Sequence, residues 1–207
     1  MSTAQIPYQS YSQHNIDIQL AEIFKKRDGF FIEAGANDGI NQSNTFLLEH
    51  FFGWRGLLVE PNPIEFVKCK LNRIDSIVEF CALVSDEYPE KTIKGDFIAD
   101  TVDASMTGGC TQYHSGDTLV PAAPLSKLLD RYHIDRVDLF SLDVEGYEME
   151  VLKGLNLNRH RPDYILFELH DVKYSENPTT FLERMGYRIT TEFTDRHLLF
   201  KSDSISS

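Results

Sequence analysis

Short apolar runs with the length of β-strands alternate along most of the chain with segments that repeat apolar residues at helical spacing. Such alternation predicts βαβ units, and therefore an α/β fold with a mainly parallel sheet and helices on both faces. The strand-like runs are residues 30–33, 56–60, 77–83, 137–142 and 164–169. The segments with helical spacing are residues 15–26, 43–51, 63–72 and 147–152, and we expect the last to stop at Gly154.

Two regions depart from this alternation. Residues 187–193 and 197–201 flank Thr194-Asp195-Arg196, which predicts an antiparallel hairpin that closes the sheet. Residues 94–124 are rich in Gly, Thr, Ser and Asp, with Gly108-Gly109 near the middle, and predict a long loop or a small β insertion. Because a long loop in a compact domain is usually functional or disordered, and this one lies between the halves of the sheet, we favour a lid.

The chain is long enough for one domain, which we expect to span residues 14–201 between flexible ends at 1–13 and 202–207. The formal net charge of -12 opposes binding of nucleic acid, because that binding depends on clustered Lys and Arg. The three cysteines form no C-x-x-C pair, so neither a disulfide framework nor a thiolate zinc site is expected. The polar N-terminus and the lack of a membrane-length apolar run predict a soluble, cytoplasmic protein without membrane contact. Oligomeric state is not predicted by these features.

The strongest chemical signal is the stretch from Phe31 to Gly39, where an apolar strand breaks into a glycine-containing turn before a helical segment. Nucleotide-like ligands bind at such turns, because glycine lets the backbone approach the ligand and the helix offers unpaired N–H groups. The G-x-G-x-x-G pattern of a dinucleotide site is absent, since Asn37 and Ile40 occupy the second and third glycine positions. Glu33 instead places a carboxylate at the strand end, which suits the ammonium and sulfonium charges of S-adenosylmethionine better than phosphates. The candidate contacts to this ligand are Glu33, Gly35, Ala36, Asn37, Asp38 and Gly39.

A second acidic strand end, Glu60, follows the turn, and Pro61-Asn62-Pro63 then redirects the chain. An acidic side chain at this position can accept hydrogen bonds from both ribose hydroxyls of a nucleoside. Alone, such a strand end is more often structural, but its combination with the Glu33 turn favours a role in ligand binding. We therefore expect Glu60 and Pro61 to belong to the same site.

The run Asp143-Val144-Glu145-Gly146-Tyr147-Glu148 directly follows the fourth strand and opens a helix. Ligands of open α/β sheets bind outside the carboxyl ends of the strands where the strand order reverses, here between the first and fourth strands. Asp143 is therefore expected to face the ligand and is a candidate for its binding and for catalysis. The structural alternative is a cap, and we expect Asp143 or Glu145 to cap the helix.

The fifth strand ends in Glu168-Leu169-His170, where the period of two puts Glu168 and His170 on the same side. A hydroxyl group hardly ionises near neutral pH, so a reaction at its oxygen is helped by a base or a cation. His170 could remove the proton, or Asp143, Glu168 and His170 could together hold a divalent cation such as Mg or Mn. A lone histidine is more often structural, and this alternative stays open beside the other two.

Four segments in a fixed order resemble the FkbM-type family of S-adenosylmethionine-dependent methyltransferases over about residues 12–201. They are Phe31 to Gly39, Ser43-Asn44-Thr45, the run from Gly53-Trp54-Arg55-Gly56 to Val59-Glu60-Pro61-Asn62-Pro63, and the run from Asp138-Leu139 through Asp143-Val144-Glu145-Gly146-Tyr147-Glu148 to Val151-Leu152-Lys153-Gly154. The resemblance implies a Rossmann-like, class I methyltransferase fold with a seven-stranded sheet, and methyl-donor binding at Glu33, Gly35 and Glu60. It also implies O-methylation of small molecules, polyketides or saccharides. The family often has Asp where Glu33 stands, and Ala82 stands where many related enzymes place an acidic residue against the adenine.

These observations lead to one main hypothesis and three alternatives. We expect an S-adenosylmethionine-dependent O-methyltransferase that acts on a hydroxyl group of a carbohydrate, with a glycan or a sugar-containing small molecule as its partner. Four aromatic side chains could stack on a sugar or could simply anchor loops; they are Tyr113, His114, Tyr147 and Tyr174. The alternatives are an O-methyltransferase for a non-sugar small molecule such as a polyketide, an NAD-dependent oxidoreductase, and a non-catalytic nucleoside-binding module.

Overall fold

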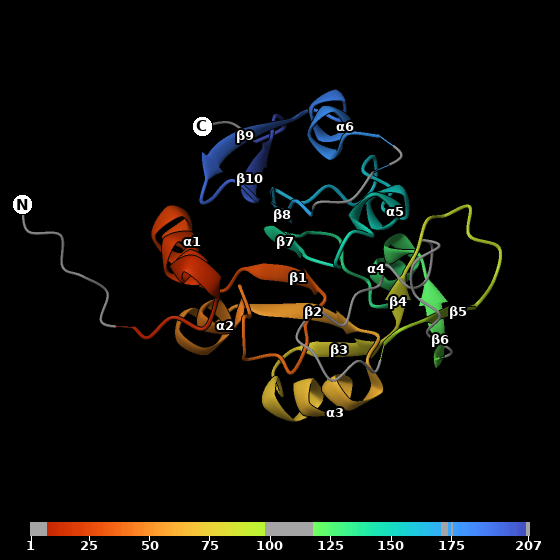
Figure 1. Cartoon of the computed structure of the whole chain (residues 1–207). Helices are drawn as coiled ribbons and strands as arrows, with labels where there is room; N and C mark the ends of the chain where they lie inside the picture. Colours follow the sequence, from red (N-terminus) through yellow and green to blue (C-terminus); the bar gives the residue numbers. More distant parts are fainter. Residues whose placement is uncertain (1–7, 98–117, 171–173, 175, 206–207) are drawn as a thin grey trace, which may run out of the picture.

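The computed structural model of the chain describes residues 8–97, 118–170, 174 and 176–205. Its centre is a seven-stranded sheet with the strand order β3-β2-β1-β7-β8-β10-β9 (Figure 1). The strands are β1 (Phe30–Ala34), β2 (Arg55–Glu60), β3 (Ile77–Phe80), β7 (Leu139–Leu142), β8 (Tyr164–Glu168), β9 (Tyr187–Glu192) and β10 (His197–Ser202). Neighbours from β3 to β8 pair in parallel, whereas β10 pairs antiparallel with both β8 and β9. The predicted α/β fold, with a mostly parallel seven-stranded sheet and a C-terminal antiparallel hairpin, is confirmed.

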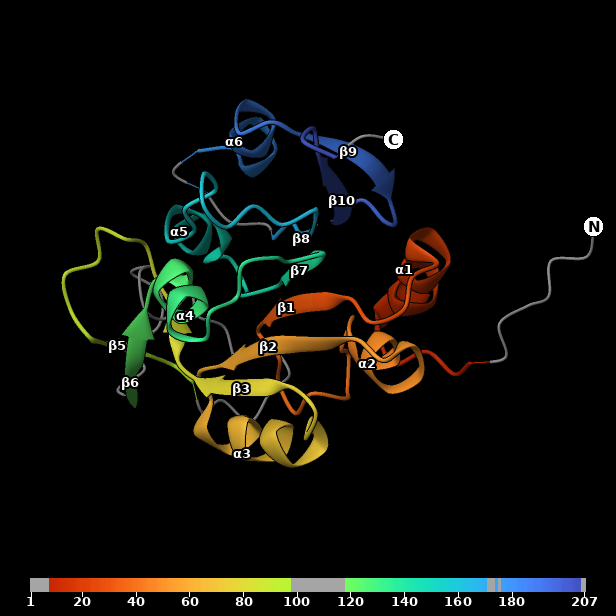
Figure 2. The ribbon, with the colours of Figure 1, turned by 180° about the vertical axis from the view of Figure 1, so that it is seen from behind.

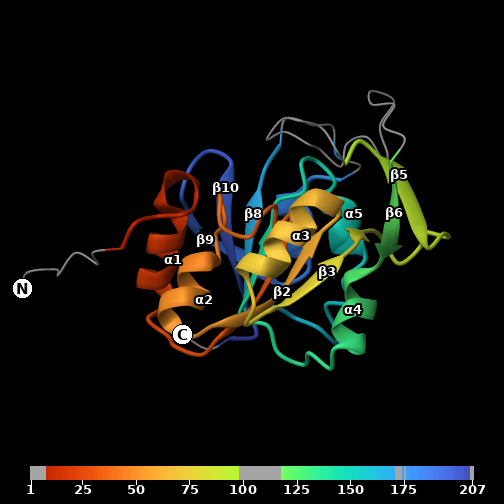
Figure 3. The same cartoon turned by 90° about the horizontal axis from the view of Figure 1, so that it is seen from below.

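Helices cover both faces of the sheet, because its central strands are apolar on both faces. The helices are α1 (Ile16–Phe24), α2 (Phe46–Phe52), α3 (Pro63–Asn72), α4 (Leu125–Arg131), α5 (Glu148–Lys153) and α6 (Pro178–Arg184), with the 3-10 turn η1 (Gln13–Asn15) before α1. Leu20 of α1, Leu47 of α2 and Cys69 of α3 share one hydrophobic cluster. Leu128 of α4 and Val151 of α5 belong to a second cluster, and Figure 3 shows these two helices across the sheet from α1, α2 and α3. We call the side of the first cluster the α1–α3 face.

Alternation along the strands directs the polar strand ends to the α1–α3 face. The apolar strand residues Phe31, Leu58, Leu139 and Leu166 all belong to the cluster on this face. The residues two positions further along are Glu33, Glu60, Ser141 and Glu168. Because side chains two residues apart in a strand point to the same side, these polar groups gather on the α1–α3 face at the carboxyl edge of the sheet. This edge carries most of the predicted site residues.

The third strand expected from the sequence is divided in two. β3 ends at Phe80, and β4 (Ala82–Leu83, labelled in Figure 1) belongs to a second sheet with the order β4-β6-β5, whose strands β5 and β6 are seen from behind in Figure 2. In this sheet β6 (Thr118–Ala123) pairs antiparallel with β5 (Thr92–Gly95) and parallel with β4. β5 and β6 lie at the two ends of the segment 94–124. The middle of that segment lies outside the described residues, so the lid stays a prediction.

Ordered contacts extend beyond the domain ends expected from the sequence. The ring of Tyr8 packs on that of Phe51 with 4.5 Å between the centroids, and β10 continues through Ser202. Helix α2 begins at Phe46 rather than at Ser43, because the hydroxyl of Ser43 accepts hydrogen bonds from the first backbone N–H groups and so closes a turn before the helix. Within the described residues, no helix is long and apolar enough to cross a membrane.

Candidate functional site

The turn after β1 lies against the loop after β7, where the strand order reverses. Gly35 has a φ of +79°, and a Cβ atom at this position would lie 1.9 Å from the carbonyl oxygen of Asp143. The backbone N–H groups of Gly35 and Ala36 both donate to the carbonyl oxygen of Val59 in β2. Only glycine therefore fits at position 35, and the turn is held between β2 and the loop after β7 while Gly35 itself is exposed.

Glu60 ends β2 beside this turn, at the place expected for a ribose-binding residue. Its carboxylate oxygens accept hydrogen bonds from the backbone N–H groups of Asn37 and Asn62, each at 2.7 Å. A carboxylate has about four acceptor positions, so roughly two remain for the hydroxyl groups of a ribose. Burial raises the pKa of Glu60 to about 7, against the lowering effect of the two N–H groups.

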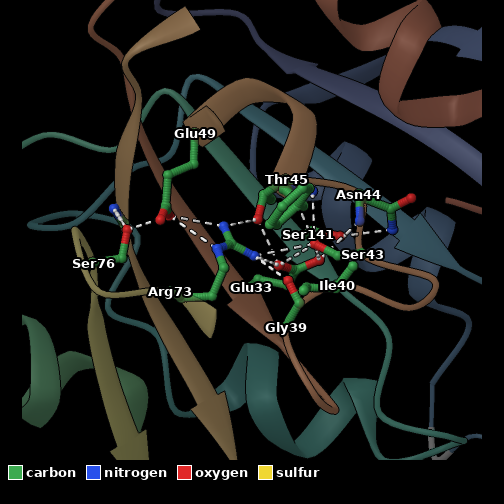
Figure 4. A network of polar contacts seen from close by, with 12 residues as sticks. Glu33, Gly39, Ile40, Ser43, Asn44, Thr45, Glu49, Arg73, Ser76 and Ser141 are labelled. Atoms are coloured by element: carbon green, nitrogen blue, oxygen red, sulfur yellow. Dashed lines mark hydrogen bonds and ion pairs between the residues drawn. The ribbon is translucent and has the colours of Figure 1, made fainter. Parts of the chain in front are cut away.

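Glu33 lies at the predicted position, but its carboxylate is engaged inside the protein (Figure 4). The side chain is buried, and its oxygens accept hydrogen bonds from Ser43 Oγ, the backbone N–H of Asn44 and Thr45 Oγ1. The guanidinium group of Arg73 lies 3.4 Å away. The carboxylate thus receives its hydrogen bonds and its counter-charge from the chain itself. Its direct contact with the ammonium group of a methyl donor stays a prediction.

Most of the remaining residues predicted for ligand binding stabilise the turn or are buried beside it. Asp38 accepts hydrogen bonds from two backbone N–H groups of its own turn, which stabilises that turn. Gly39 packs on α3, and Ala36 and Pro61 are buried beneath the turn and at the end of β2. Ala82 is fully buried inside the second sheet, so its side chain offers no surface to an adenine ring.

Asp143, Glu168 and His170 come together at the ends of β7 and β8, as their positions predict. One possible ligand atom from each residue lies within 4.8 Å of the other two. Nε2 of His170 lies 3.3 Å from Oδ1 of Asp143, and Nδ1 lies 3.4 Å from Oε2 of Glu145. The side chain of Asp143 is 35% exposed, and its backbone N–H donates to Ala34 beside the glycine turn. The cluster therefore adjoins the turn and keeps one carboxylate open to a reactant.

Burial and the neighbouring charges together raise the pKa values of Asp143 and His170 and lower that of Glu168. Burial raises the pKa of Asp143 to about 7, assisted by the charges of Glu168 and Glu145 and opposed by the hydrogen bond to His170. Burial lowers the pKa of His170, but the hydrogen bond to Asp143 and the neighbouring carboxylates outweigh it and raise the pKa to about 9. Burial also acts against the charge of Glu168, but its contacts with His197 leave the pKa lowered. At neutral pH His170 is therefore an imidazolium, and Asp143 is the group that titrates near neutrality.

Glu148, the first residue of α5, holds the loop after β7. It is fully buried, and its Oε1 accepts hydrogen bonds from the backbone N–H groups of Val144 and Gly146. No side chain caps α5, so the prediction that Asp143 or Glu145 caps this helix is wrong. A glutamate in the first turn of a helix ordinarily complements the helix dipole, which is why the sequence does not single out Glu148.

His197, which no motif identifies, and Tyr174, which the sequence suggests only as a ring that could stack on a sugar, complete the surroundings of the cluster. Nε2 of His197 lies 3.2 Å from Oε2 of Glu168, its partner across β10 and β8. The hydroxyl of Tyr174 donates to Glu148 and accepts from the backbone N–H of His170. The strand pairing is the only signal that could place His197 here, and it becomes available only once the order of the strands is known.

The strand order, the glycine turn at the reversal point and the acidic end of β2 define a Rossmann-like α/β protein, a class in which nucleotide-like ligands bind at the reversal point. Residues 33–189 match the family described as Methyltransferase FkbM domain. Since this match covers more than half of the chain, the chain belongs to the FkbM methyltransferase family. This membership supports S-adenosylmethionine-dependent methyl transfer and favours it over an NAD-dependent oxidoreductase. No curated protein matches the chain.

Two solved structures are similar to most of the chain. The first is a TehB-like SAM-dependent methyltransferase from Corynebacterium glutamicum ATCC 13032 Kitasato, with a TM-score of 0.44, 12% identity, and coverage of 91% of this chain and 88% of that chain. The second is a SAM-dependent methyltransferase from Geobacter sulfurreducens in complex with S-adenosyl-L-homocysteine, with a TM-score of 0.45, 9% identity, and coverage of 89% and 68%. At this level of similarity neither structure assigns a role to a residue of this chain.

Proposed function

We propose that the chain is an S-adenosylmethionine-dependent O-methyltransferase that methylates a hydroxyl group of a carbohydrate. The observation that carries this proposal is the contact between the glycine turn and Asp143. A side chain at position 35 would collide with the backbone carbonyl oxygen of Asp143, so Asp143, whose carboxylate is partly exposed, lies beside the turn expected to bind the methyl donor. A base next to the donor assists methyl transfer to a hydroxyl group, because that group hardly ionises by itself.

The residues of the cluster can then be given distinct roles. S-adenosylmethionine, when bound, supplies a methyl group attached to a positively charged sulfur. During transfer of that methyl group to a hydroxyl oxygen, Asp143 would take up the hydroxyl proton. A pKa of about 7 suits Asp143 for this step. His170, with a pKa of about 9, is a poor base at neutral pH and orients Asp143 through Nε2.

A divalent cation is the second candidate for assistance to the reaction. The carboxylates of Asp143 and Glu168 and the imidazole of His170 are the residue types that hold Mg or Mn, and their ligand atoms lie within 4.8 Å of one another. In that role the cation would stabilise the negative charge that develops on the acceptor oxygen. His170 would have to lose a proton to bind it.

The carbohydrate acceptor is supported by partly exposed carboxylates more than by aromatic rings. The side chains of Asp143 and Glu145 are each 35% exposed, and a carboxylate can accept hydrogen bonds from several hydroxyl groups. Of the aromatic residues considered for stacking, Tyr147 is buried, the hydroxyl of Tyr174 is hydrogen-bonded to Glu148 and His170, and Tyr113 and His114 lie outside the described residues. A polyketide alcohol is the alternative acceptor.

Incubation of the chain with methyl-labelled S-adenosylmethionine and a panel of glycans, monosaccharides and polyketide alcohols tests the proposal. We expect label on at least one carbohydrate, with product formation unchanged by a chelator if Asp143 is the base. Loss of product with chelator, restored by Mg or Mn, would show that a divalent cation, rather than Asp143 as a base, assists the reaction. Label only on polyketide alcohols would reject a carbohydrate as the acceptor. Binding of S-adenosylhomocysteine without any transfer would favour a non-catalytic module, and absence of binding would overturn the proposal altogether.

Affinity for the donor should depend on the protonation of Glu60. The ribose hydroxyls need the ionised carboxylate as acceptor, so protonation competes with binding. We expect the dissociation constant of S-adenosylhomocysteine, measured by calorimetry, to rise as the pH falls through about 7. Glu60→Gln should weaken binding by about 1–3 kcal/mol above this pH and remove the pH dependence. The same pH profile in the variant would show that another group is responsible.

We also propose a cytoplasmic location. Its support is the state of Cys69 and Cys81, which are buried free thiols among the described residues, as is usual for proteins of reducing compartments. Recovery of the native protein from the culture medium or a membrane fraction would contradict it.

A further inference from the structure

Arg73 directly follows α3 and buries its whole side chain between that helix and the end of β1. The exposed fraction of the side chain is 0%. Its Nε and Nη2 donate to Oε2 of Glu49 in α2, at 3.0 and 2.9 Å. The rings of Phe31 and Phe46 lie 5.2 and 5.6 Å from the guanidinium carbon. A charge enclosed in this way needs counter-charges, and Figure 4 shows Glu33 and Glu49 on different sides of the guanidinium group.

The third nitrogen of Arg73, Nη1, reaches the turn after β1. It donates to the carbonyl oxygen of Gly39 at 2.9 Å and lies 3.4 Å from Oε2 of Glu33. Gly39 has a φ of +81°, and a Cβ atom there would lie 2.8 Å from Cγ of Arg73, so the turn packs on the stem of the arginine. Asn72 donates from Nδ2 to the carbonyl oxygen of Asp38. The end of α3 thus holds two successive carbonyl groups of the turn.

Glu33 connects the hydrogen bonds of Arg73 to β7, the strand that leads to Asp143. Its Oε1 accepts a hydrogen bond from the backbone N–H of Asn44. Asn44 in turn donates from Nδ2 to Ser141 Oγ at 3.1 Å, and Ser141 lies in β7 two residues before Asp143. A connected set of hydrogen bonds therefore runs from α3 through the end of β1 to β7, along the border of the turn (Figure 4).

We propose that Arg73 is a positioning residue for binding of the methyl donor, and that Glu33 acts through Arg73 rather than on the donor. This inference rests on the proposed function. The N–H groups of a guanidinium lie in a fixed plane, so Arg73 sets the distance between the carbonyl of Gly39 and the carboxylate of Glu33. The turn is thereby held in one conformation before the donor arrives, which reduces the entropy lost on binding.

Arg73→Lys tests this role, because lysine keeps the charge but its single nitrogen cannot reach Glu49 and the turn at the same time. We expect the dissociation constant of S-adenosylhomocysteine to rise at least about tenfold. The KM for S-adenosylmethionine should rise with little change in kcat at saturation. Amide hydrogen exchange in residues 35–45 of the ligand-free variant should become faster. If Glu33 bound the ammonium group directly, the same substitution would free its carboxylate and affinity would be maintained or increased.

Glu49→Gln is the matched control, because it removes a charge beside the same guanidinium on the side away from the turn and keeps an acceptor oxygen. We expect both variants to unfold at lower temperature, but the affinity of Glu49→Gln should stay within about twofold of the wild type. Equal loss of affinity in both variants, or unchanged exchange in residues 35–45 of Arg73→Lys, would overturn the positioning role. Failure of the wild-type chain to bind S-adenosylhomocysteine would contradict the proposed function, whereas the exchange comparison would still decide what Arg73 does to the turn.

Discussion

Asp143→Asn should lower kcat by about 10²- to 10⁴-fold while the dissociation constant of S-adenosylhomocysteine stays within about threefold. Asparagine has nearly the same shape but cannot take the hydroxyl proton. In the wild type, Asp143 must be ionised to act, so kcat should fall as the pH drops through about 7. The residual kcat of Asp143→Asn should not show this fall with pH. Initial rates against pH, with an acceptor from the labelled panel, measure both effects.

Asp135→Asn provides the control, because Asp135 is exposed and lies before β7, at the end of the sheet opposite the site. Its kcat and pH profile should match those of the wild type. Retention of more than about a tenth of the wild-type kcat in Asp143→Asn would exclude a general-base role for this residue. A cation held by the cluster would then have to be considered first.

Gly35→Ala should abolish measurable binding of the donor, with a loss of at least about 100-fold in affinity. The backbone at Gly35 is in the left-handed region, and the added Cβ would lie 1.9 Å from the carbonyl oxygen of Asp143. The glycine turn and the loop after β7 must therefore move apart, which displaces the groups expected on both sides of the methyl group. Calorimetry with S-adenosylhomocysteine measures the loss of donor affinity, and thermal unfolding separately measures the loss of stability.

Gly186→Ala is the matched control for backbone strain. Gly186 has a φ of +80°, but its Cβ would meet only Arg161 Nη1, at 3.7 Å, and it lies between α6 and β9, away from the site. Both substitutions should cost about 1–2 kcal/mol of stability for the left-handed backbone. Only Gly35→Ala should lose the donor as well. Equal donor affinity in the two folded variants would show that the turn after β1 does not form the donor site.

Much of the fold could be predicted because most strands and four of the six described helices carry their own pattern, whereas α4 and α6 are not among the predicted elements. The apolar runs of β1, β2, β7 and β8, and the two runs of the hairpin, lie where the structure has strands. The break between β3 and β4 could not be predicted in the same way. Residues 77–83 contain no turn residue, and their division depends on pairing of β4 with β6, which lies far along the chain.

In the site, too, some residues could be identified from the sequence around them, whereas others are placed by partners far along the chain. Gly35, Glu60 and Asp143 are identified by their places at strand ends, and the structure puts them around one turn. Glu33 has the same kind of place, but its carboxylate contacts Arg73, which lies 40 residues further along the chain. An arginine at the end of a helix ordinarily complements the helix dipole. No local pattern therefore distinguishes the buried role of Arg73 from a common surface role.

The most direct measurement of the central claim is a crystal structure of the chain with S-adenosylhomocysteine. We predict that both ribose hydroxyls contact the free acceptor positions of Glu60, and that the sulfur lies beside Gly35 and faces Asp143. We also predict that the carboxylate of Glu33 remains paired with Arg73 beneath the bound ligand. Density for the ligand at any other place, with the ends of β1 and β2 closed by protein side chains, would contradict the account.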